Sequence, residues 1–125
     1  MPEHRKVLVV DDDELVRAVI NKVAERHNLQ PVWAKNGNEA IGLLAQNNHF
    51  SAIFLDLLMP NCPGWDVIAF IKDNEQTKNL PIVIVSGAPI SENEKERLLT
   101  KATAFVDKET FSLAAFEKLL ETVLT

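Results

Sequence analysis

Apolar residues in this chain form short continuous runs that alternate with longer stretches of helical spacing. The runs are rich in Val and Ile and are apolar at consecutive positions, which is typical of strands buried on both faces of a parallel sheet. In the longer stretches, apolar residues recur three or four positions apart, which predicts helices with one buried face. The predicted strands are 7–10, 30–34, the run through 53–55 that ends at Asp56, 80–87 and 104–107.

Five helices are predicted between and after these strands, and most of them begin at a side chain that can accept a backbone hydrogen bond. Asp12 or Asp13 can cap the first helix, where negative charge also suits the helix dipole. Asn38, Ser91 and Ser112 are the expected caps of the second, fourth and fifth helices. The residues expected to face the core are Leu15, Val16, Val19, Ile20 and Val23 in the first helix, Ala40, Ile41, Leu44 and Ala45 in the second, Val67, Ile68, Phe70 and Ile71 in the third, and Leu113, Phe116, Leu119, Leu120 and Val123 in the fifth.

The alternation of five strands with five helices indicates an α/β fold in which helices cover both faces of a parallel sheet. The 125 residues are enough for one domain with one sizeable core, so the predicted domain is 1–125. Hydrophobic residues make up 46% and charged residues 25% of the chain, which is an ordinary globular composition.

Charge, hydrophobic run length and cysteine content argue against a nucleic-acid-binding, membrane-spanning or disulfide-bonded protein. The formal net charge is -5, so we expect no broad nucleic-acid-binding surface. No apolar run is long enough to span a membrane, and the four apolar residues after Lys6 are too few for a signal-peptide core. Cys62 is the only cysteine and cannot form an intrachain disulfide, which fits a cytoplasmic protein.

Polar side chains stand where four of the five predicted strands end. Asp11 and Asp12 follow the first strand, Asp56 the third and Lys108 the fifth, and Ser86 lies near the end of the fourth. Asp56 alone could be an ordinary turn residue, because Asp is common in turns. The carboxyl ends of parallel strands, however, share one edge of the sheet, where ligands bind in open α/β folds. The convergence of three acids, a hydroxyl and a lysine favours a functional site.

These residue types suit phosphoryl transfer. Three clustered carboxylates repel one another unless a cation lies among them, and Mg²⁺ prefers such hard oxygen ligands. A carboxylate can accept a phosphoryl group as an acyl phosphate. Lys108 would supply the positive charge that the phosphoryl oxygens require.

The chain resembles the receiver domain of bacterial two-component response regulators over essentially its whole length. The resemblance rests on the run 7–10 followed by Asp11 and Asp12, Asp56 followed by Met59-Pro60, Ser86 thirty positions after Asp56, and Phe105 three positions before Lys108. It implies a flavodoxin-like, doubly wound five-stranded parallel sheet in the order 2-1-3-4-5 with five helices.

The resemblance implies a role for each residue of the site. Asp56 would accept a phosphoryl group from a histidine kinase or a histidine phosphotransfer protein. Asp12 would bind Mg²⁺ directly and Asp11 mainly through a metal-bound water, and Asp56 and the main-chain carbonyl of Leu58 would be further ligands. The domain would thereby catalyse its own phosphorylation and dephosphorylation without being a conventional enzyme.

The resemblance also implies how the signal would reach the surface. Ser86 would bond to a phosphoryl oxygen, and Lys108 would pair first with the carboxylate and then with the phosphoryl group. Phe105 would be the switch aromatic and would turn inward as Ser86 moves. A downstream effector protein or domain would read the surface around the fourth helix, the fifth strand and the fifth helix.

Two other functions are compatible with the sequence. A degenerate receiver would bind a partner without phosphorylation, and Glu109 leaves this alternative open, because receivers usually have proline after the lysine. A small phosphohydrolase would use Asp11 and Asp13 as an Asp-x-Asp pair, although Asp56 would then have no role and the chain has little room for a substrate cap. Asp13 is expected to be a helix cap rather than a metal ligand.

Three differences from the usual receiver pattern lead to further expectations. With Glu109 in place of proline, the peptide after Lys108 is expected to be trans rather than cis. Lys101-Ala102 replaces the common Gly-Ala before the fifth strand, at a position that often takes a positive φ. Cys62-Pro63-Gly64 is expected to stiffen the loop after Asp56.

Leu58 leads to a prediction about the lifetime of the phosphorylated form. Many receivers have a polar residue two positions after the acceptor, whereas the apolar side chain of Leu58 cannot orient a water molecule for hydrolysis. We expect the unmodified protein to lose its phosphoryl group more slowly than a Leu58→Asn variant, as measured by the decay of the phosphorylated mass. Equal or faster loss by the unmodified protein would contradict this role.

Overall fold

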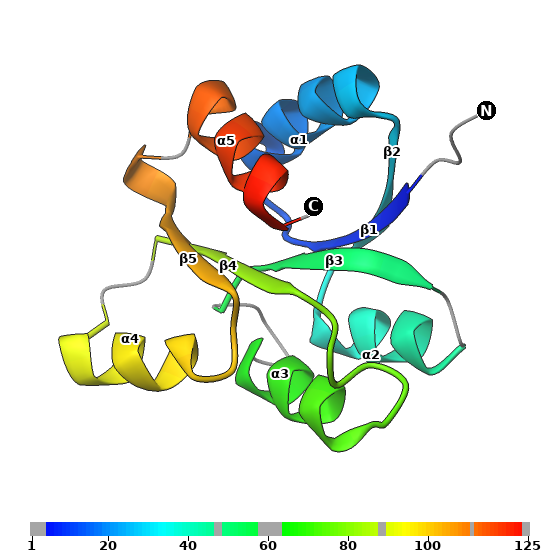
Figure 1. The fold of residues 1–125 in the computed structure, drawn as a ribbon, viewed down its shortest axis with the longest axis vertical. Coiled ribbons are helices and arrows are strands. Elements are labelled where there is room, and N and C mark those ends of the chain that lie inside the picture. The colour runs from blue at the N-terminus through cyan, green and yellow to red at the C-terminus, as the bar shows by residue number, and fades with distance from the viewer. Residues whose placement is uncertain (1–4, 47–48, 58–63, 88–89, 111, 124–125) are drawn as a thin grey trace.

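The computed structural model describes residues 5–46, 49–57, 64–87, 90–110 and 112–123 (Figure 1). Strands and helices alternate along the chain in the predicted order. The strands are β1 (Arg5–Val10), β2 (Leu29–Ala34), β3 (Phe50–Leu55), β4 (Ile82–Ser86) and β5 (Ala104–Asp107). The helices are α1 (Glu14–His27), α2 (Gly37–Ala45), α3 (Gly64–Asp73), α4 (Glu92–Leu99) and α5 (Leu113–Val123), with a short 3-10 helix, η1 (Lys108–Thr110), after β5.

The five strands form one parallel sheet in the order β2-β1-β3-β4-β5, which confirms the predicted fold. Two helices, α1 and α5, cover one face of the sheet, and α2, α3 and α4 cover the other (Figure 1). This order places β1 beside β3, so the residues that follow these strands, Asp11 and Asp56, lie at neighbouring strand ends.

Each face of the sheet has its own hydrophobic core, because successive residues of a strand point to opposite faces. Val7 and Val9 of β1 pack with residues of α1 and α5, whereas Leu8 and Val10 pack with residues of the helices on the other face. All four side chains are fully buried, and the burial of one such side chain stabilises a fold by about 1.5–3 kcal/mol. The continuous apolar runs in the sequence therefore reflect strands that are covered on both sides.

Three helix caps agree with the prediction. Asp13 Oδ1 accepts a hydrogen bond of 2.9 Å from the Leu15 N–H at the start of α1. The hydroxyls of Ser91 and Ser112 accept backbone N–H groups at the starts of α4 and α5 in the same way. These bonds satisfy donors that the first turn of a helix leaves without a partner.

Two element boundaries differ from the prediction. The cap of α2 is Asn36 and not Asn38, because the extended backbone of Asn36 makes Gly37 the first helical residue and so places Asn38 inside the first turn. The fourth strand is shorter than expected and ends at Ser86. It begins only after Pro81, which has no N–H to donate to a neighbouring strand.

The buried face of α1 also differs from the prediction, because Leu15 is 70% exposed. The buried stripe of this helix contains Val16, Ile20 and Val23. Each residue advances about 100° around an α-helix, so Leu15 lies to the side of the stripe that begins at Val16. Ala45, at the end of α2, was likewise predicted to face the core and is exposed.

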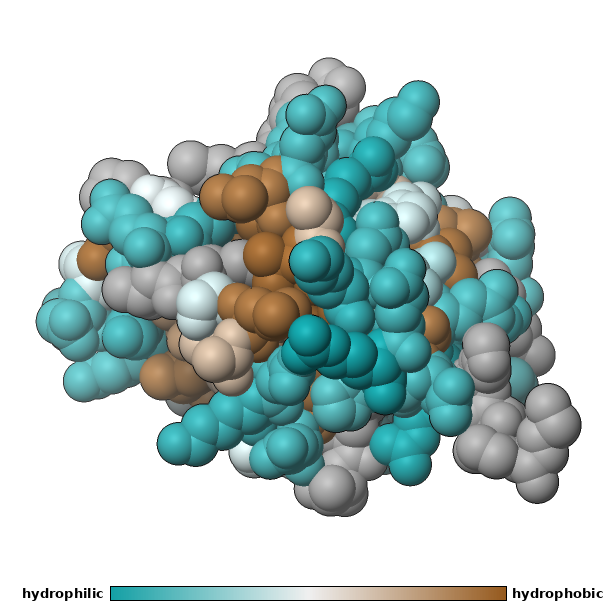
Figure 2. All heavy atoms as spheres, turned by 90° about the horizontal axis from the view of Figure 1, so that it is seen from above, coloured by the Kyte–Doolittle hydropathy of each residue, from teal (hydrophilic) through white to brown (hydrophobic). Residues whose placement is uncertain are grey.

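The outer surface of α1 and α5 is mainly hydrophilic, with a band of apolar side chains across its middle (Figure 2). Arg26 of α1 and Glu117 of α5 form an ion pair of 2.7 Å on the surface. A surface pair of this kind contributes about 0–1 kcal/mol, so the buried apolar contacts stabilise the packing of these helices far more. Among the described helices, none has the length and apolar character needed to cross a membrane.

Ile20 and Leu15 provide a matched test of which residues of α1 form the core. Ile20 is fully buried, so Ile20→Ala is expected to lower the free energy of unfolding by about 2–5 kcal/mol. Leu15→Ala truncates an exposed side chain and is expected to change this free energy by less than about 0.5 kcal/mol. Urea unfolding followed by circular dichroism measures both values. Similar losses for the two variants would contradict the observed orientation of α1.

Candidate functional site

Two buried carboxylates lie side by side at the carboxyl edge of the sheet. Asp11 follows β1 and is 2% exposed, and Asp56 follows β3 and is 5% exposed. The Asp56 N–H donates a hydrogen bond of 3.0 Å to the Val10 carbonyl, which continues the pairing of the two strands up to the site. Asp12, which is exposed, adds a third carboxylate, and ligand oxygens of the three aspartates all lie within 4.8 Å of one another. The structure thus brings together the three acids that the sequence places at these strand ends.

Lys108, which follows the edge strand β5, supplies a positive charge to this cluster. It begins η1 directly after β5, and its Nζ lies 3.2 Å from Asp11 Oδ1 and 3.1 Å from Asp56 Oδ2. A third carboxylate oxygen, Asp13 Oδ2, is 3.6 Å from the same nitrogen. The ammonium group therefore connects the ends of three strands, since β1 and β3 each carry one of its buried partners.

The surroundings shift the pKa of two groups in the cluster. Burial raises the pKa of Asp11 and the charge of Asp56 adds to this effect, whereas a hydrogen bond of 2.9 Å from the Asp13 N–H and the charge of Lys108 oppose it. Burial alone would lower the pKa of Lys108. Its hydrogen bond with Asp56 and the charges of Asp11 and Asp56 outweigh burial and raise the pKa of Lys108. The lysine is therefore fully protonated at neutral pH.

One buried oxygen of the cluster has no hydrogen-bond partner among the described residues. It is Asp11 Oδ2, which is buried, whereas Asp11 Oδ1 accepts from both Lys108 and Asp13. A buried carboxylate oxygen without a partner is energetically costly, and a bound cation would compensate for it. The oxygens of Asp11, Asp12 and Asp56 fit Mg²⁺, which binds to proteins through few carboxylates and retains several water molecules.

Ser86 lies on β4 and Phe105 on β5, the paired strands at the edge of the sheet from which Lys108 follows. Ser86 is the last residue of β4 and is 1% exposed. A Cβ added to the following residue, Gly87, would lie 3.6 Å from the Lys108 Cβ, which shows that the end of β4 is adjacent to the lysine stem. Phe105 in β5 is half-buried, and the Nζ of Lys95 in α4 lies 5.4 Å from the centroid of its ring. The aromatic ring therefore contacts the neighbouring helix through a cation–π interaction.

The peptide bond after Lys108 is trans, as expected where Glu109 replaces proline. The Glu109 N–H donates a hydrogen bond of 2.9 Å to Asp107 Oδ1. In the part of the chain that is described, Lys108 forms ion pairs with three aspartates and none with Glu109. The turn at Lys101-Ala102 forms without a positive φ, since Asn28 is the one described non-glycine residue in that conformation.

One contact of the site was missed from the sequence, and one expectation lies outside the described residues. Asp13 was expected only to cap α1, which it does, but its second carboxylate oxygen also faces Lys108. The available signal was its place in an unbroken run of three acids after β1. Leu58, whose carbonyl was expected to bind the metal, lies outside the described residues, as do Met59-Pro60 and Cys62.

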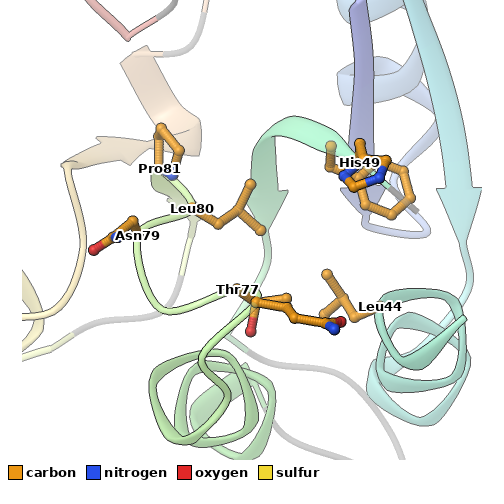
Figure 3. A pocket seen from close by; sticks show the side chains of 8 residues that line it. Leu44, His49, Thr77, Asn79, Leu80 and Pro81 are labelled. Atoms are coloured by element: carbon orange, nitrogen blue, oxygen red, sulfur yellow. The ribbon is translucent and has the colours of Figure 1, made fainter. Parts of the chain in front are cut away.

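A separate cavity of about 580 Å³ lies at the opposite edge of the sheet (Figure 3). Two of its lining residues stand directly before strands, His49 before β3 and Pro81 before β4, so the cavity is at the amino ends of the strands. Its lining among the described residues contains no acid and therefore does not offer a carboxylate cluster for a metal. The lining residues labelled in Figure 3 are Leu44, His49, Thr77, Asn79, Leu80 and Pro81.

Comparison with known proteins gives one family over nearly the whole chain. A model of the response regulator receiver domain matches residues 7–121. The two-component response regulator ORR7 of Oryza sativa subsp. japonica is 33% identical over 92 residues, which cover 74% of this chain and 42% of that protein. The transcriptional regulatory protein SrrA of Staphylococcus aureus is 29% identical over 103 residues, which cover 82% of this chain and 41% of that protein. The chain thus spans about two fifths of the length of these curated relatives.

Solved structures share the fold. The chemotaxis response regulator CheY4 of Vibrio cholerae is similar with a TM-score of 0.82 and 27% identity, and 97% of this chain and 99% of that chain are covered. The receiver domain of the sensor histidine kinase PA1611 of Pseudomonas aeruginosa PAO1 has a TM-score of 0.81 and 18% identity, with 97% and 98% covered. The structure of that receiver domain holds a magnesium ion in its active site cleft.

Lys108→Met tests the electrostatic balance of the cluster. The variant keeps an unbranched side chain but removes the charge that faces two buried carboxylates, so the free energy of unfolding at neutral pH is expected to fall by about 1–3 kcal/mol. Lys78→Met is the matched control, because Glu75, the partner of Lys78, is 85% exposed and such a pair contributes about 0–1 kcal/mol. Urea unfolding measures both changes. A loss for Lys108→Met no larger than that for Lys78→Met would contradict the balancing role.

Proposed function

The chain belongs to the family of response regulator receiver domains, the phosphoacceptor modules of two-component signalling, and we propose that Asp56 is its phosphorylated residue. The observation that carries this proposal is the position of the Asp56 carboxylate. It is buried, 3.1 Å from the Lys108 ammonium and within 4.8 Å of ligand oxygens of Asp11 and Asp12. A carboxylate in this position has a cation beside it for the phosphoryl oxygens and acidic ligands beside it for a metal ion.

Phosphorylation of Asp56 would be a direct phosphoryl transfer. An oxygen of the carboxylate attacks phosphorus, and the bond between phosphorus and a histidine nitrogen of the donor breaks in line with the attack. The electron pair of the broken bond stays with the imidazole nitrogen, and the product is an acyl phosphate on Asp56. The donor class is a histidine kinase or a histidine phosphotransfer protein, which the family membership supports.

A Mg²⁺ site at this edge would be formed by Asp11, Asp12 and Asp56, with the main-chain carbonyl of Leu58 as the further ligand expected from the sequence. When bound, Mg²⁺ offsets the negative charge of the carboxylates and of the incoming phosphoryl group. The buried Asp11 Oδ2, to which no described residue donates, supports this site. Lys108 would exchange its contact with Asp56 for one with a phosphoryl oxygen, which its flexible stem allows.

Ser86 and Phe105 are the proposed connection between the site and the surface. The Ser86 hydroxyl would bond to a phosphoryl oxygen once phosphorylation has added roughly two negative charges. Phe105 would then turn inward and away from Lys95 of α4. An effector protein or domain would read the changed surface of α4, β5 and α5. Family membership and the place of Ser86 at the end of β4 support this part of the proposal.

The proposal also includes where the reaction takes place and how it is reversed. The exchange would take place in the cytoplasm, and the net charge of -5 supports the expectation that the chain itself does not bind nucleic acid. The domain would also hydrolyse its own acyl phosphate, so that the signal is reversible. The presence of three acids, a buried serine and a paired lysine at one edge supports an active receiver over a degenerate one.

Intact-mass spectrometry after incubation with acetyl phosphate and Mg²⁺ tests the proposed acceptor. The parent protein is expected to gain one phosphoryl group, and Asp56→Asn is expected to gain none, because an amide is a far weaker nucleophile than a carboxylate. Removal of Mg²⁺ by a chelator is expected to abolish the gain in the parent protein.

Asp73→Asn is the control for this experiment, since it removes an exposed carboxylate from the end of α3. It is expected to gain a phosphoryl group at the rate of the parent protein. A phosphoryl group that still appears on Asp56→Asn would show that Asp56 is not the acceptor.

A further inference from the structure

We propose that Gly64 positions the phosphoacceptor, because its missing side chain lets α3 lie directly against the main chain of Asp56. This inference rests on the proposed function of Asp56. Gly64 begins α3 and is buried, and its N–H donates a hydrogen bond of 3.1 Å to the Leu57 carbonyl. The start of the helix is therefore bonded to the chain immediately after the acceptor.

The space beside Gly64 is too small for any side chain. A Cβ added there would lie 2.7 Å from the carbonyl oxygen of Asp56 and 2.8 Å from the Cα of Leu57. Both distances are below 3.0 Å, which Cβ contacts in proteins essentially never reach. The two atoms belong to the main chain and cannot turn aside as the end of a flexible side chain can. A substitution at this position must therefore move either α3 or the backbone of Asp56 and Leu57.

The glycine is required for space and not for its backbone conformation. No described glycine has a positive φ, so Gly64 does not adopt the left-handed conformation that usually selects this residue. The helix is also poorly able to move away, because Val67 and Ile68 in its next turn are buried in the core. In a close-packed interior such a conflict is passed to the neighbouring atoms, which here belong to the acceptor.

A displaced main chain would change the geometry of the whole cluster. The Asp56 carboxylate is 3.1 Å from Lys108, and its main chain is bonded to Val10, so a shift at residues 56–57 moves the carboxylate relative to Asp11. Reacting groups have to be held within about 0.5 Å of their productive geometry. Gly64 would thus act through Asp56 as a positioning residue and would not itself touch the phosphoryl group.

Gly42 offers a matched control for this inference. It lies in the interior of α2, whereas Gly64 is the first residue of α3, and a Cβ added to Gly42 would have no atom within 4 Å. Gly42→Ala therefore makes the same chemical change without a conflict. It is expected to raise the thermal midpoint, because alanine favours a helix interior more than glycine does.

The experiment compares Gly64→Ala with Gly42→Ala in three measurements at a temperature where both are folded. The dissociation constant for Mg²⁺ alone is expected to rise about 10- to 100-fold in Gly64→Ala, as it does when the supports of metal ligands are altered. The rate of phosphorylation by acetyl phosphate at saturating Mg²⁺ is expected to fall about 10- to 100-fold. The amide NMR signals of Asp56 and Leu57 are expected to shift. Gly42→Ala is expected to leave all three unchanged.

The outcomes separate positioning from a purely structural role. A folded Gly64→Ala protein that binds Mg²⁺ and is phosphorylated like Gly42→Ala would overturn the inference. Should Gly64→Ala not fold by itself, it is combined with Gly42→Ala and compared with Gly42→Ala alone. Failure to fold even in that background would also overturn the inference, because the glycine would then serve the fold and not the acceptor.

The same experiment separates this inference from the proposed function. If the parent protein is not phosphorylated at Asp56, the proposed function fails, and Mg²⁺ affinity and the amide signals alone decide the role of Gly64. If the parent is phosphorylated and Gly64→Ala is unaffected, the inference fails and the proposed function stands.

Discussion

The site depends on one electrostatic arrangement, in which Lys108 lies between two buried carboxylates. Asp11 and Asp56 come from neighbouring strands, and their like charges would repel one another in a poorly hydrated edge of the sheet. The ammonium group, at 3.2 and 3.1 Å from them, offsets this repulsion, although burial, with a smaller contribution from the charge of Asp56, still raises the pKa of Asp11. With one ammonium group beside three clustered carboxylates, the site still favours a further cation.

The fold makes this arrangement possible because each strand is apolar along its buried length and polar residues follow at its carboxyl end. The interior of the sheet is apolar on both faces, and the buried polar and charged residues of the described chain, Asp11, Asp56 and Ser86, lie at the carboxyl ends of strands. The order of the strands brings β1 and β3 together in the middle, and the turn after β5 reaches back to them through Lys108. The main chain of Asp56, the proposed acceptor, also lies against the start of α3, since a Cβ added to Gly64 would be 2.7 Å from the Asp56 carbonyl oxygen. The positions of the charged groups at this edge thus depend on β1, β3, the turn after β5 and the start of α3 together.

Sequence patterns were most informative where they report a local property averaged over several residues. Runs of apolar residues identified all five strands, and the strand order followed from the family resemblance. Errors arose where a single position mattered. Leu15 and Val16 are both apolar neighbours, and periodicity alone could not tell which of them begins the buried stripe. Asn36 and Asn38 are both good caps, and only the backbone conformation decides between them.

The sequence by itself determined which chemical groups meet at one edge of a parallel sheet, because strand and helix periodicity follow from local hydrogen bonding and burial. It therefore placed Asp11, Asp56 and Lys108 at one edge without any distance between them, and the family resemblance implied that Lys108 pairs with the carboxylate of Asp56. Only the tertiary structure decided that Lys108 also faces Asp13, that Asp11 Oδ2 has no donor among the described residues, and that Gly64 lies against the main chain of Asp56. Such contacts join residues far apart in the chain, and their lengths are set by the packing of whole elements against one another, which no local pattern records.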